Sequence, residues 1–167
     1  MRPETPAGLI DRFASTGVLL DANLLLLLVV GSYDRRRIET FKRLSVFAPE
    51  DFDLLVAIVG KFKRLIVTPH VLTEVSNLAG SLPANVKDAC FQTFAAAIVA
   101  ADETTMSSAS VATRSEFRRF GLADTIIMQV AARPTLILTI DFPLAQYLAS
   151  HSLPVINFNH IRYLNWS

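Results

Sequence analysis

Four acidic residues are the first candidates for chemistry, because each of them lies among apolar neighbours. Asp21, Glu74, Asp124 and Asp141 occur in the segments Leu-Leu-Asp-Ala-Asn, Leu-Thr-Glu-Val, Leu-Ala-Asp-Thr-Ile-Ile and Leu-Thr-Ile-Asp-Phe. Acidic side chains are rarely buried unless they are paired or bind a metal. If the four converge, their mutual repulsion favours a bound divalent cation. A set of oxygen ligands without a His or Cys cluster favours Mg²⁺ or Mn²⁺ over Zn²⁺.

The elements that must position these acids are short apolar strands separated by helical segments. Continuous apolar runs predict buried strands at 18–20, 65–67, 136–140 and 155–158, and residues 102–108 are an ambiguous edge strand. Apolar spacing and helix-ending residues predict helices at 23–31, 35–47, 49–59, 69–79, 85–101, 110–120, 122–132 and 143–150. Alternating strands and helices predict an α/β fold with three layers, α/β/α, around a parallel sheet of four or five strands.

This arrangement brings the acids to one edge of the sheet. Asp21 and Asp141 directly follow predicted strands, Asp124 lies in the first turn of a helix, and Glu74 lies in the second turn of the helix after 65–67. Ligands of such folds bind at the carboxyl ends of the strands. For each acid alone a structural role is an alternative: Asp21 and Asp141 as helix caps, Asp124 as a first-turn acid, and Glu74 as a solvated charge.

Composition excludes several classes of protein. The chain has 167 residues, of which 51% are hydrophobic and 19% charged, and its net charge is +1. These values exclude intrinsic disorder, and a single cysteine, Cys90, excludes a disulfide scaffold. The apolar run Leu24 to Val30 is too short to span a membrane, and the first residues do not resemble a secretory signal. We expect a cytoplasmic protein without membrane contact, whose apolar excess favours a homodimer.

Four segments in order resemble the motifs of the PIN domain family. Leu20-Asp21-Ala22-Asn23 resembles its opening D-x-N/S motif, and Pro69 to Val75 resembles the helix that carries its glutamate. Gly121 to Ile127 resembles the family's helix start, and Leu138 to Phe142 resembles its last acidic strand end. Residues 1–167 would then form a single PIN-like domain, with a lengthened helical insertion around 31–63. The acid that some members carry shortly after the position of Asp141 is missing here.

The resemblance implies a metal-dependent endoribonuclease that hydrolyses RNA phosphodiester bonds. Asp21, Glu74, Asp124 and Asp141 would be the catalytic residues and would bind Mg²⁺ or Mn²⁺. Many family members are toxins of toxin–antitoxin pairs, so a small antitoxin protein is an expected partner. Replacing Asp21 or Asp124 by Asn is expected to abolish cleavage and to leave the fold intact or more stable.

Other residues could support such a site. Asn23, Thr125 and Thr139 are candidate hydrogen-bond partners of the carboxylates, although strand propensity alone explains a threonine at 139. The basic residues expected to contact RNA are Arg35, Arg36, Arg37, Arg118 and Arg119. Their alternative role is to solvate helix faces.

Two further classes of function remain open. A haloacid-dehalogenase-type phosphatase, or another metal-dependent phosphoesterase, would also use acids at a sheet edge. The dehalogenase type requires a second Asp where this chain has Asn23. A non-catalytic PIN-like binding protein is the other alternative, although all four acids are present.

Overall fold

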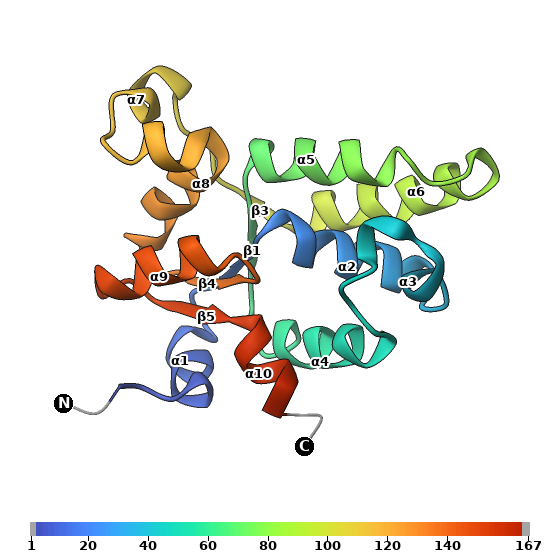
Figure 1. The fold of residues 1–167 in the computed structure, drawn as a ribbon, viewed down its shortest axis with the longest axis horizontal. Coiled ribbons are helices and arrows are strands. Elements are labelled where there is room, and N and C mark those ends of the chain that lie inside the picture. Colours follow the sequence, from blue (N-terminus) through green and yellow to red (C-terminus); the bar gives the residue numbers. More distant parts are fainter. Residues whose placement is uncertain (1–2, 165–167) are drawn as a thin grey trace.

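A five-stranded parallel sheet forms the centre of the molecule (Figure 1), in a computed structural model that describes residues 3–164. Its strands are β1 (Val18–Leu20), β2 (Leu65–Val67), β3 (Asp102–Glu103), β4 (Leu136–Thr139) and β5 (Val155–Asn157). They are arranged in the order β3-β2-β1-β4-β5, and all neighbours are parallel. Helices flank this sheet, so the predicted three-layer α/β/α class is confirmed.

The helices follow most of the predicted boundaries. They are α1 (Pro6–Phe13), α2 (Ala22–Tyr33), α3 (Arg37–Thr40), α4 (Pro49–Val59), α5 (Pro69–Ala79), α6 (Ala84–Ala100), α7 (Ser108–Ala112), α8 (Phe117–Ala131), α9 (Phe142–Ser150) and α10 (Phe158–Leu164), with a 3₁₀ helix, η1, at Lys42–Leu44. None of the helices within residues 3–164 is long and apolar enough to cross a membrane.

Helix α2 is the centre of one helical layer and packs against α4, α5 and α6. Its sequence is apolar all round because neighbours cover it on every side, and Leu24 to Leu27 are almost fully buried. Gly31 allows the closest approach in this layer. A Cβ atom at this position would lie 2.3 Å from a carbon of the Phe52 ring in α4, so only glycine fits there.

The strand order reverses direction at the centre of the sheet. The chain moves outward from β1 to β2 and β3, returns through α7 and α8, and enters β4 on the other side of β1. Neighbouring strands β1 and β4 therefore form the switch point at which open α/β sheets bind their ligands. Asp21 follows β1 and Asp141 lies two residues after β4, so both acids lie at this point.

The predicted helix at 35–47 is wrong, because this segment forms α3 and η1 with extended backbone at Phe41 between them. The buried residues are Ile38, Phe41, Leu44 and Phe47. Their spacing of three matches a 3₁₀ turn better than the 3.6-residue period of an α-helix. The lengthened segment therefore follows its apolar pattern as a chain of short turns rather than as one helix.

The structure also differs from the predictions at three other places. The segment 110–120 is not one helix, because α7 ends at Ala112 and α8 begins at Phe117. Strand β5 ends at Asn157, and Phe158 begins α10, which the sequence pattern did not predict. Helix α1 was not predicted either.

Candidate functional site

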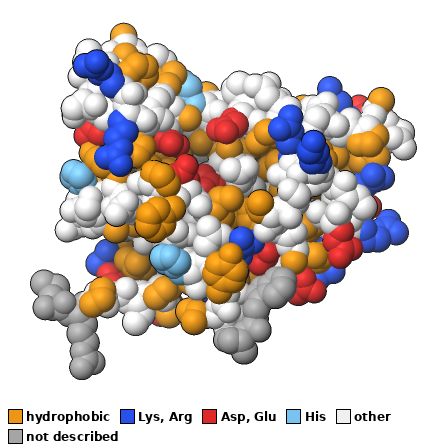
Figure 2. Space-filling model, viewed as in Figure 1, with side chains coloured by type: hydrophobic (Ala, Val, Ile, Leu, Met, Phe, Trp, Pro, Cys, Tyr) orange, Lys and Arg blue, Asp and Glu red, His pale blue; other side chains and the backbone are white. Residues whose placement is uncertain are grey.

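The four predicted acids line one pocket of about 140 Å³ at the carboxyl end of the sheet. We call it the acidic pocket and define it by Asp21, Glu74, Asp124 and Asp141. They come from the start of α2, from α5, from α8 and from the start of α9. Figure 2 shows acidic side chains gathered in a hollow at the middle of one face. The predicted convergence is therefore present.

Asp21 is the most rigidly held of the four. It is buried, with a relative exposure of 7%. Its Oδ1 atom accepts a hydrogen bond from the backbone N–H of Leu24 at 2.9 Å, which makes Asp21 the N-cap of α2. Its Oδ2 atom accepts from the N–H of Ile140 at 2.8 Å and from the hydroxyl of Thr139. Asp21 is therefore both a helix cap and a wall of the acidic pocket.

Thr139 connects the two strand-end acids. Its hydroxyl donates to Asp21 and accepts the backbone N–H of Asp141 at 2.9 Å. Asp141 in turn caps α9, because its Oδ1 atom accepts the N–H of Leu144 at 2.8 Å. The expected hydrogen bond from Thr139 to a carboxylate is confirmed. The buried hydroxyl fixes the relative positions of β1 and the start of α9.

Asp124 and Glu74 approach the pocket from the flanking helices. Asp124 is half-buried on α8, and three residues before it the backbone leaves helical geometry at Gly121 (φ 80°, ψ −176°). A positive φ of this size favours glycine, and the kink marks the start of the turn that carries Asp124. Glu74 is exposed on α5.

Unlike Thr139, the other two expected supporting residues, Thr125 and Asn23, do not donate a hydrogen bond to a carboxylate. The hydroxyl of Thr125 donates to the carbonyl of Gly121 at 2.6 Å, so the prediction that it supports a carboxylate is wrong. It strengthens the kink at Gly121 instead. Asn23 is exposed and lines the acidic pocket, and within residues 3–164 it makes no hydrogen bond to a carboxylate.

The acidic pocket is electrostatically strained. The pKa of Asp124 is raised from 3.8 to about 6, first by burial and then by the negative charges of Asp141, Asp21 and Glu74. Burial also raises the pKa of Asp21, although its three hydrogen bonds oppose this shift. No Lys or Arg is among the residues that line the pocket. The negative charges of the pocket are therefore not offset by a basic side chain of its lining.

The chemistry of this set of ligands fits a hard divalent cation, since every candidate ligand atom is a carboxylate oxygen. Within residues 3–164, however, no group of three or more His, Cys, Asp or Glu side chains is arranged so that it could hold a metal ion. Asp21 and Asp141 each keep one oxygen engaged with a helix N-terminus. The pocket thus offers fixed ligands on one wall and the less restrained Glu74 on the other.

The basic residues do not enter the acidic pocket. Arg35 forms an ion pair with Asp53 at 2.7 Å, and both Arg36 and Arg37 face Asp34. Three arginines thus share two carboxylates, so their charges are partly offset by acids of the same chain. Arg118 and Arg119 are exposed at the start of α8, and the Arg119 guanidinium lies 4.7 Å from the centre of the Phe120 ring. Figure 2 shows Lys and Arg side chains over the α7–α8 region, beside the acidic hollow.

Asn159 is a supporting residue that the sequence analysis missed. Its side-chain amide donates to the carbonyl of Ile140 at 3.2 Å, and its backbone N–H donates to Oδ1 of Asn157 at 3.0 Å. Since the N–H of Ile140 donates to Asp21, Asn159 holds the same residue through its carbonyl group. Asn157 pairs in register with Thr139 across β4 and β5. No local sequence pattern indicates this role, because it depends on contacts between distant segments.

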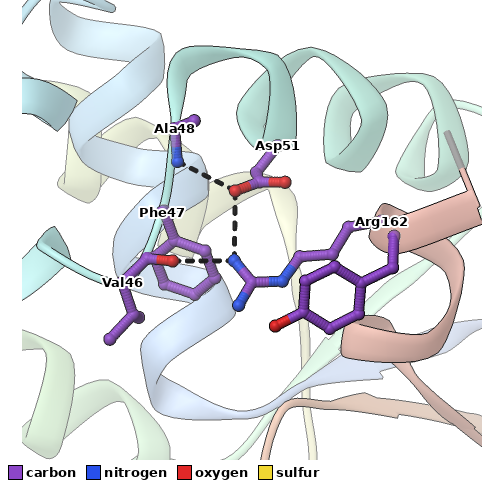
Figure 3. A pocket seen from close by; sticks show the side chains of 6 residues that line it. Val46, Phe47, Ala48, Asp51 and Arg162 are labelled. Atoms are coloured by element: carbon purple, nitrogen blue, oxygen red, sulfur yellow. Dashed lines mark hydrogen bonds and ion pairs between the residues drawn. The ribbon is translucent and has the colours of Figure 1, made fainter. Parts of the chain in front are cut away.

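A larger pocket of about 330 Å³ lies between the start of α4 and α10, and Figure 3 shows it. Nη1 of Arg162 donates to the Val46 carbonyl at 2.7 Å and to Oδ2 of Asp51 at 3.1 Å. The N–H of Ala48 donates to the same Asp51 oxygen at 2.8 Å. The charged groups of this pocket are paired with each other, so its size alone does not make it the chemical site.

No protein-family model matches the chain, and neither does any curated protein or solved structure. The resemblance to PIN domains therefore remains an interpretation of four short motifs.

Proposed function

We propose that the chain is a PIN-type, metal-dependent endoribonuclease whose active site is the acidic pocket. The observation that carries this proposal is the shared pocket of Asp21, Glu74, Asp124 and Asp141, in which burial and then the neighbouring negative charges raise the pKa of Asp124 to about 6. A pocket with this charge and without a lining Lys or Arg favours a bound divalent cation.

Each acid has a distinct task in this proposal. Asp21 is held by three donors, so its carboxylate keeps one orientation while ligands exchange. Asp124 and Asp141 would bind the cation beside it, and Glu74 would complete the ligand set from the solvent side. The cation, Mg²⁺ or Mn²⁺, would activate a water molecule for attack on phosphorus and neutralise charge on the phosphate.

The size of the pocket favours a polymer over a small phosphate ester. Pockets that enclose small-molecule substrates usually measure about 300–1,000 Å³, and the acidic pocket measures about 140 Å³. It can accommodate a backbone phosphate while the rest of the strand lies outside. The exposed Arg118 and Arg119 at the start of α8 would contact that strand.

A cleavage assay with two substrates tests the proposal. Purified protein is treated with EDTA, Mn²⁺ is added back, and hydrolysis of single-stranded RNA is compared with that of a phosphomonoester. We expect Mn²⁺-dependent RNA cleavage and no release from the monoester. Asp124→Asn should lower the RNA rate about 100-fold or more, while the control Asp53→Asn, at an exposed ion pair, should leave it unchanged.

Three outcomes would contradict the proposal. RNA cleavage that persists in EDTA would remove the role of the metal. Hydrolysis of the monoester alone would favour another phosphoesterase. Metal binding without any hydrolysis would favour a non-catalytic PIN-like protein.

A homodimer and an antitoxin are further parts of this proposal. An apolar groove of about 340 Å³ between α5 and α6, lined in part by Leu72, Phe91, Phe94 and Ile98, supports self-association. Sedimentation of the purified chain would give its oligomeric state. Growth arrest on expression, relieved by the neighbouring open reading frame, would support a toxin–antitoxin pair.

A further inference from the structure

A second polar pocket, of about 270 Å³, lies toward the amino-terminal edge of the sheet. We call it the basic pocket and define it by its polar lining residues, which are Ser15, Thr16, Arg64, Thr104, Arg133 and Thr135. Thr16, Arg64 and Thr135 lie one or two residues before β1, β2 and β4, whereas the acidic pocket lies at the carboxyl ends of the strands. The two pockets share no lining residue, so each can have a ligand of its own.

The charges of the basic pocket favour an anion. Its lining combines two guanidinium groups with four hydroxyl groups and contains no Asp or Glu. Nε of Arg64 donates to Oδ2 of Asp102 at 2.5 Å, and the other N–H groups of this guanidinium have no partner within residues 3–164. Arg133 is exposed, and in the same part of the chain its side chain forms neither an ion pair nor a hydrogen bond. Two arginines therefore face one nearby acid, and one positive charge is left over.

Thr135 supplies an independent sign of a ligand. Only 3% of this residue is exposed, yet its hydroxyl makes no hydrogen bond within the described residues. Buried polar groups almost always have a partner. In residues 3–164 the fully enclosed side-chain atoms without a partner belong to Asp51, His70, Asn159 and Arg162. The hydroxyl of Thr135 is not one of these atoms, so it keeps contact with the pocket that Thr135 lines.

The backbone around these donors is already ordered. The N–H of Thr135 donates to the carbonyl of Arg133 at 2.7 Å, and the N–H of Val18 donates to the carbonyl of Arg64 at 3.1 Å. The N–H of Leu136 donates to the carbonyl of Gly17 at 3.1 Å. Because these bonds fix the chain on both sides of the pocket, a ligand loses little affinity to the ordering of the backbone.

The remaining lining is apolar and consists of Ile66, Val130 and Pro134. A pocket with donors on one wall and apolar groups on another suits an organic molecule with an anionic end. Its volume of about 270 Å³ is near the lower limit of small-molecule sites, which usually measure about 300–1,000 Å³. The ligand is therefore small.

We propose that the basic pocket binds the phosphate group of a small phosphate monoester. The guanidinium groups of Arg64 and Arg133 bind the phosphate oxygens, and the hydroxyl of Thr135 donates to them. A monoester phosphate carries a charge of about −1.5 to −2 at pH 7, whereas a phosphate of an RNA backbone carries one negative charge. Two guanidinium groups therefore favour the monoester. This inference does not depend on the proposed nuclease function.

The experiment titrates glycerol 3-phosphate and inorganic phosphate into the metal-free full chain and measures the heat of binding. The variants are Arg133→Gln and Thr135→Val. The matched control is Arg43→Gln, at another exposed arginine, which does not line the basic pocket. We expect glycerol 3-phosphate to bind saturably and more tightly than inorganic phosphate. Each variant should raise its Kd about 10-fold, because each removes a hydrogen bond to a charged group, and Arg43→Gln should match the wild type.

Thermal melts without ligand separate binding from folding. Thr135→Val keeps the β-branched shape and removes a hydroxyl that has no partner in residues 3–164, so its melting temperature should equal or exceed that of the wild type. In heteronuclear NMR, glycerol 3-phosphate should shift the amide signals of residues 15–17, 64 and 133–135, and it should leave that of Asp124 unchanged.

Four outcomes would overturn the inference. No saturable binding of either compound at millimolar concentration would show that the pocket has no such ligand. Equal affinity for both compounds would exclude an organic ester as the preferred ligand. An equal loss of affinity in Arg43→Gln and Arg133→Gln would indicate attraction to the overall charge of the chain. Binding of RNA that Arg133→Gln weakens, without binding of glycerol 3-phosphate, would identify an RNA contact instead. None of these results bears on Mn²⁺ binding by the acidic pocket.

Discussion

Two regions of this protein bury carboxylates, and they treat the charge in opposite ways. Asp51 has a side-chain exposure of 2% and lies against Arg162, whose side chain is 13% exposed. Asp21 is buried too, but the nearest charged group that influences it is another acid, Asp141. The first region neutralises its carboxylate with a cation from its own chain, whereas the second gathers four acids without one.

The difference separates a buried ion pair from a pocket whose carboxylates have no basic side chain in the lining. Arg162 connects α10 to the residues that begin α4, and Figure 3 shows its guanidinium between Val46 and Asp51. No Lys or Arg lines the acidic pocket, where burial and then repulsion from the other acids raise the pKa of Asp124. The fold thus pairs one buried acid with an arginine and leaves the acids of the acidic pocket without a basic partner in its lining, which supports the proposal that the second set binds a cation.

The largest expected effect on stability comes from removing the guanidinium of Arg162. Arg162→Met should lower the free energy of unfolding by about 3–5 kcal/mol, because it leaves Asp51 buried without a counter-charge. Chemical denaturation measures this loss. The double variant Asp51→Asn/Arg162→Met should recover part of it, and Arg35→Ala, at the exposed pair with Asp53, should cost less than about 1 kcal/mol. If Arg162→Met lowered the free energy of unfolding no more than Arg35→Ala does, the buried acid Asp51 would not depend on its arginine, and the contrast between the two regions would not hold.

A smaller effect should follow from loosening the hydrogen bonds that orient the acidic pocket. Thr139→Val keeps the shape of the side chain and removes the hydroxyl that joins Asp21 to Asp141. We expect Mn²⁺ affinity to fall about 10–100-fold, as for other groups that orient metal ligands. Thr139→Ser should restore it. Thr135→Val, at the buried start of the same strand, is the control and should bind Mn²⁺ as the wild type does.

The pH dependence of stability should show the repulsion directly. Burial and the neighbouring acids raise the pKa of Asp124 in the folded protein from its ordinary value of 3.8 to about 6. An acid whose pKa is raised by folding stabilises the protein below its unfolded pKa, and this contribution is lost as pH rises through the folded value. Without metal, the free energy of unfolding should therefore fall by about 1–2 kcal/mol between pH 4 and pH 7, after allowance for partial solvent screening.

Asp124→Asn should lack this fall, and its melting temperature at pH 7 without metal should exceed that of the wild type. Thermal melts of both proteins across this pH range, in EDTA, provide the measurement. Parallel curves for the two proteins would show that Asp124 does not experience the repulsion.

The smallest effects concern the basic residues outside both regions. Replacing Arg118 and Arg119 by Ala should weaken RNA binding for unrelated sequences and flatten the slope of log K against log salt by up to ~0.7 per lost contact. Arg35 to Arg37 already pair with Asp53 and Asp34, so their replacement should change the slope less. Binding measured at several salt concentrations separates the two clusters. Equal slopes for both variants would contradict this assignment.

Most of the fold and the grouping of the acids could be predicted, because both follow from local pattern. Buried parallel strands are continuous apolar runs, and their carboxyl ends meet at one edge, so Asp21 and Asp141 could be placed without coordinates. The short turns around Phe41 could not, since their apolar spacing of three was taken for a helical period. The prediction also missed Asn159, because its role depends on contacts between distant segments.

The hydrogen bonds of Asp21 argue against one expectation, the unchanged or higher stability of Asp21→Asn. From its charge alone, Asp21→Asn should relieve repulsion and leave the fold as stable or more stable. The carboxylate, however, accepts three hydrogen bonds on its two oxygens. An asparagine presents an NH₂ group in place of one oxygen, so a donor would face a donor there. Asp124 is therefore the better position for separating the loss of metal binding from the loss of stability.

Calorimetric titration of Mn²⁺ into the metal-free wild type and into Asp124→Asn tests the central claim most directly. The account predicts that the wild type binds Mn²⁺ and becomes more stable, by about 2.7 kcal/mol when the free ion is at 100 times its Kd. Asp124→Asn should show little or no binding, and Asp53→Asn should match the wild type. A wild type that binds no Mn²⁺, or an Asp124→Asn variant that binds it equally well, would contradict the account.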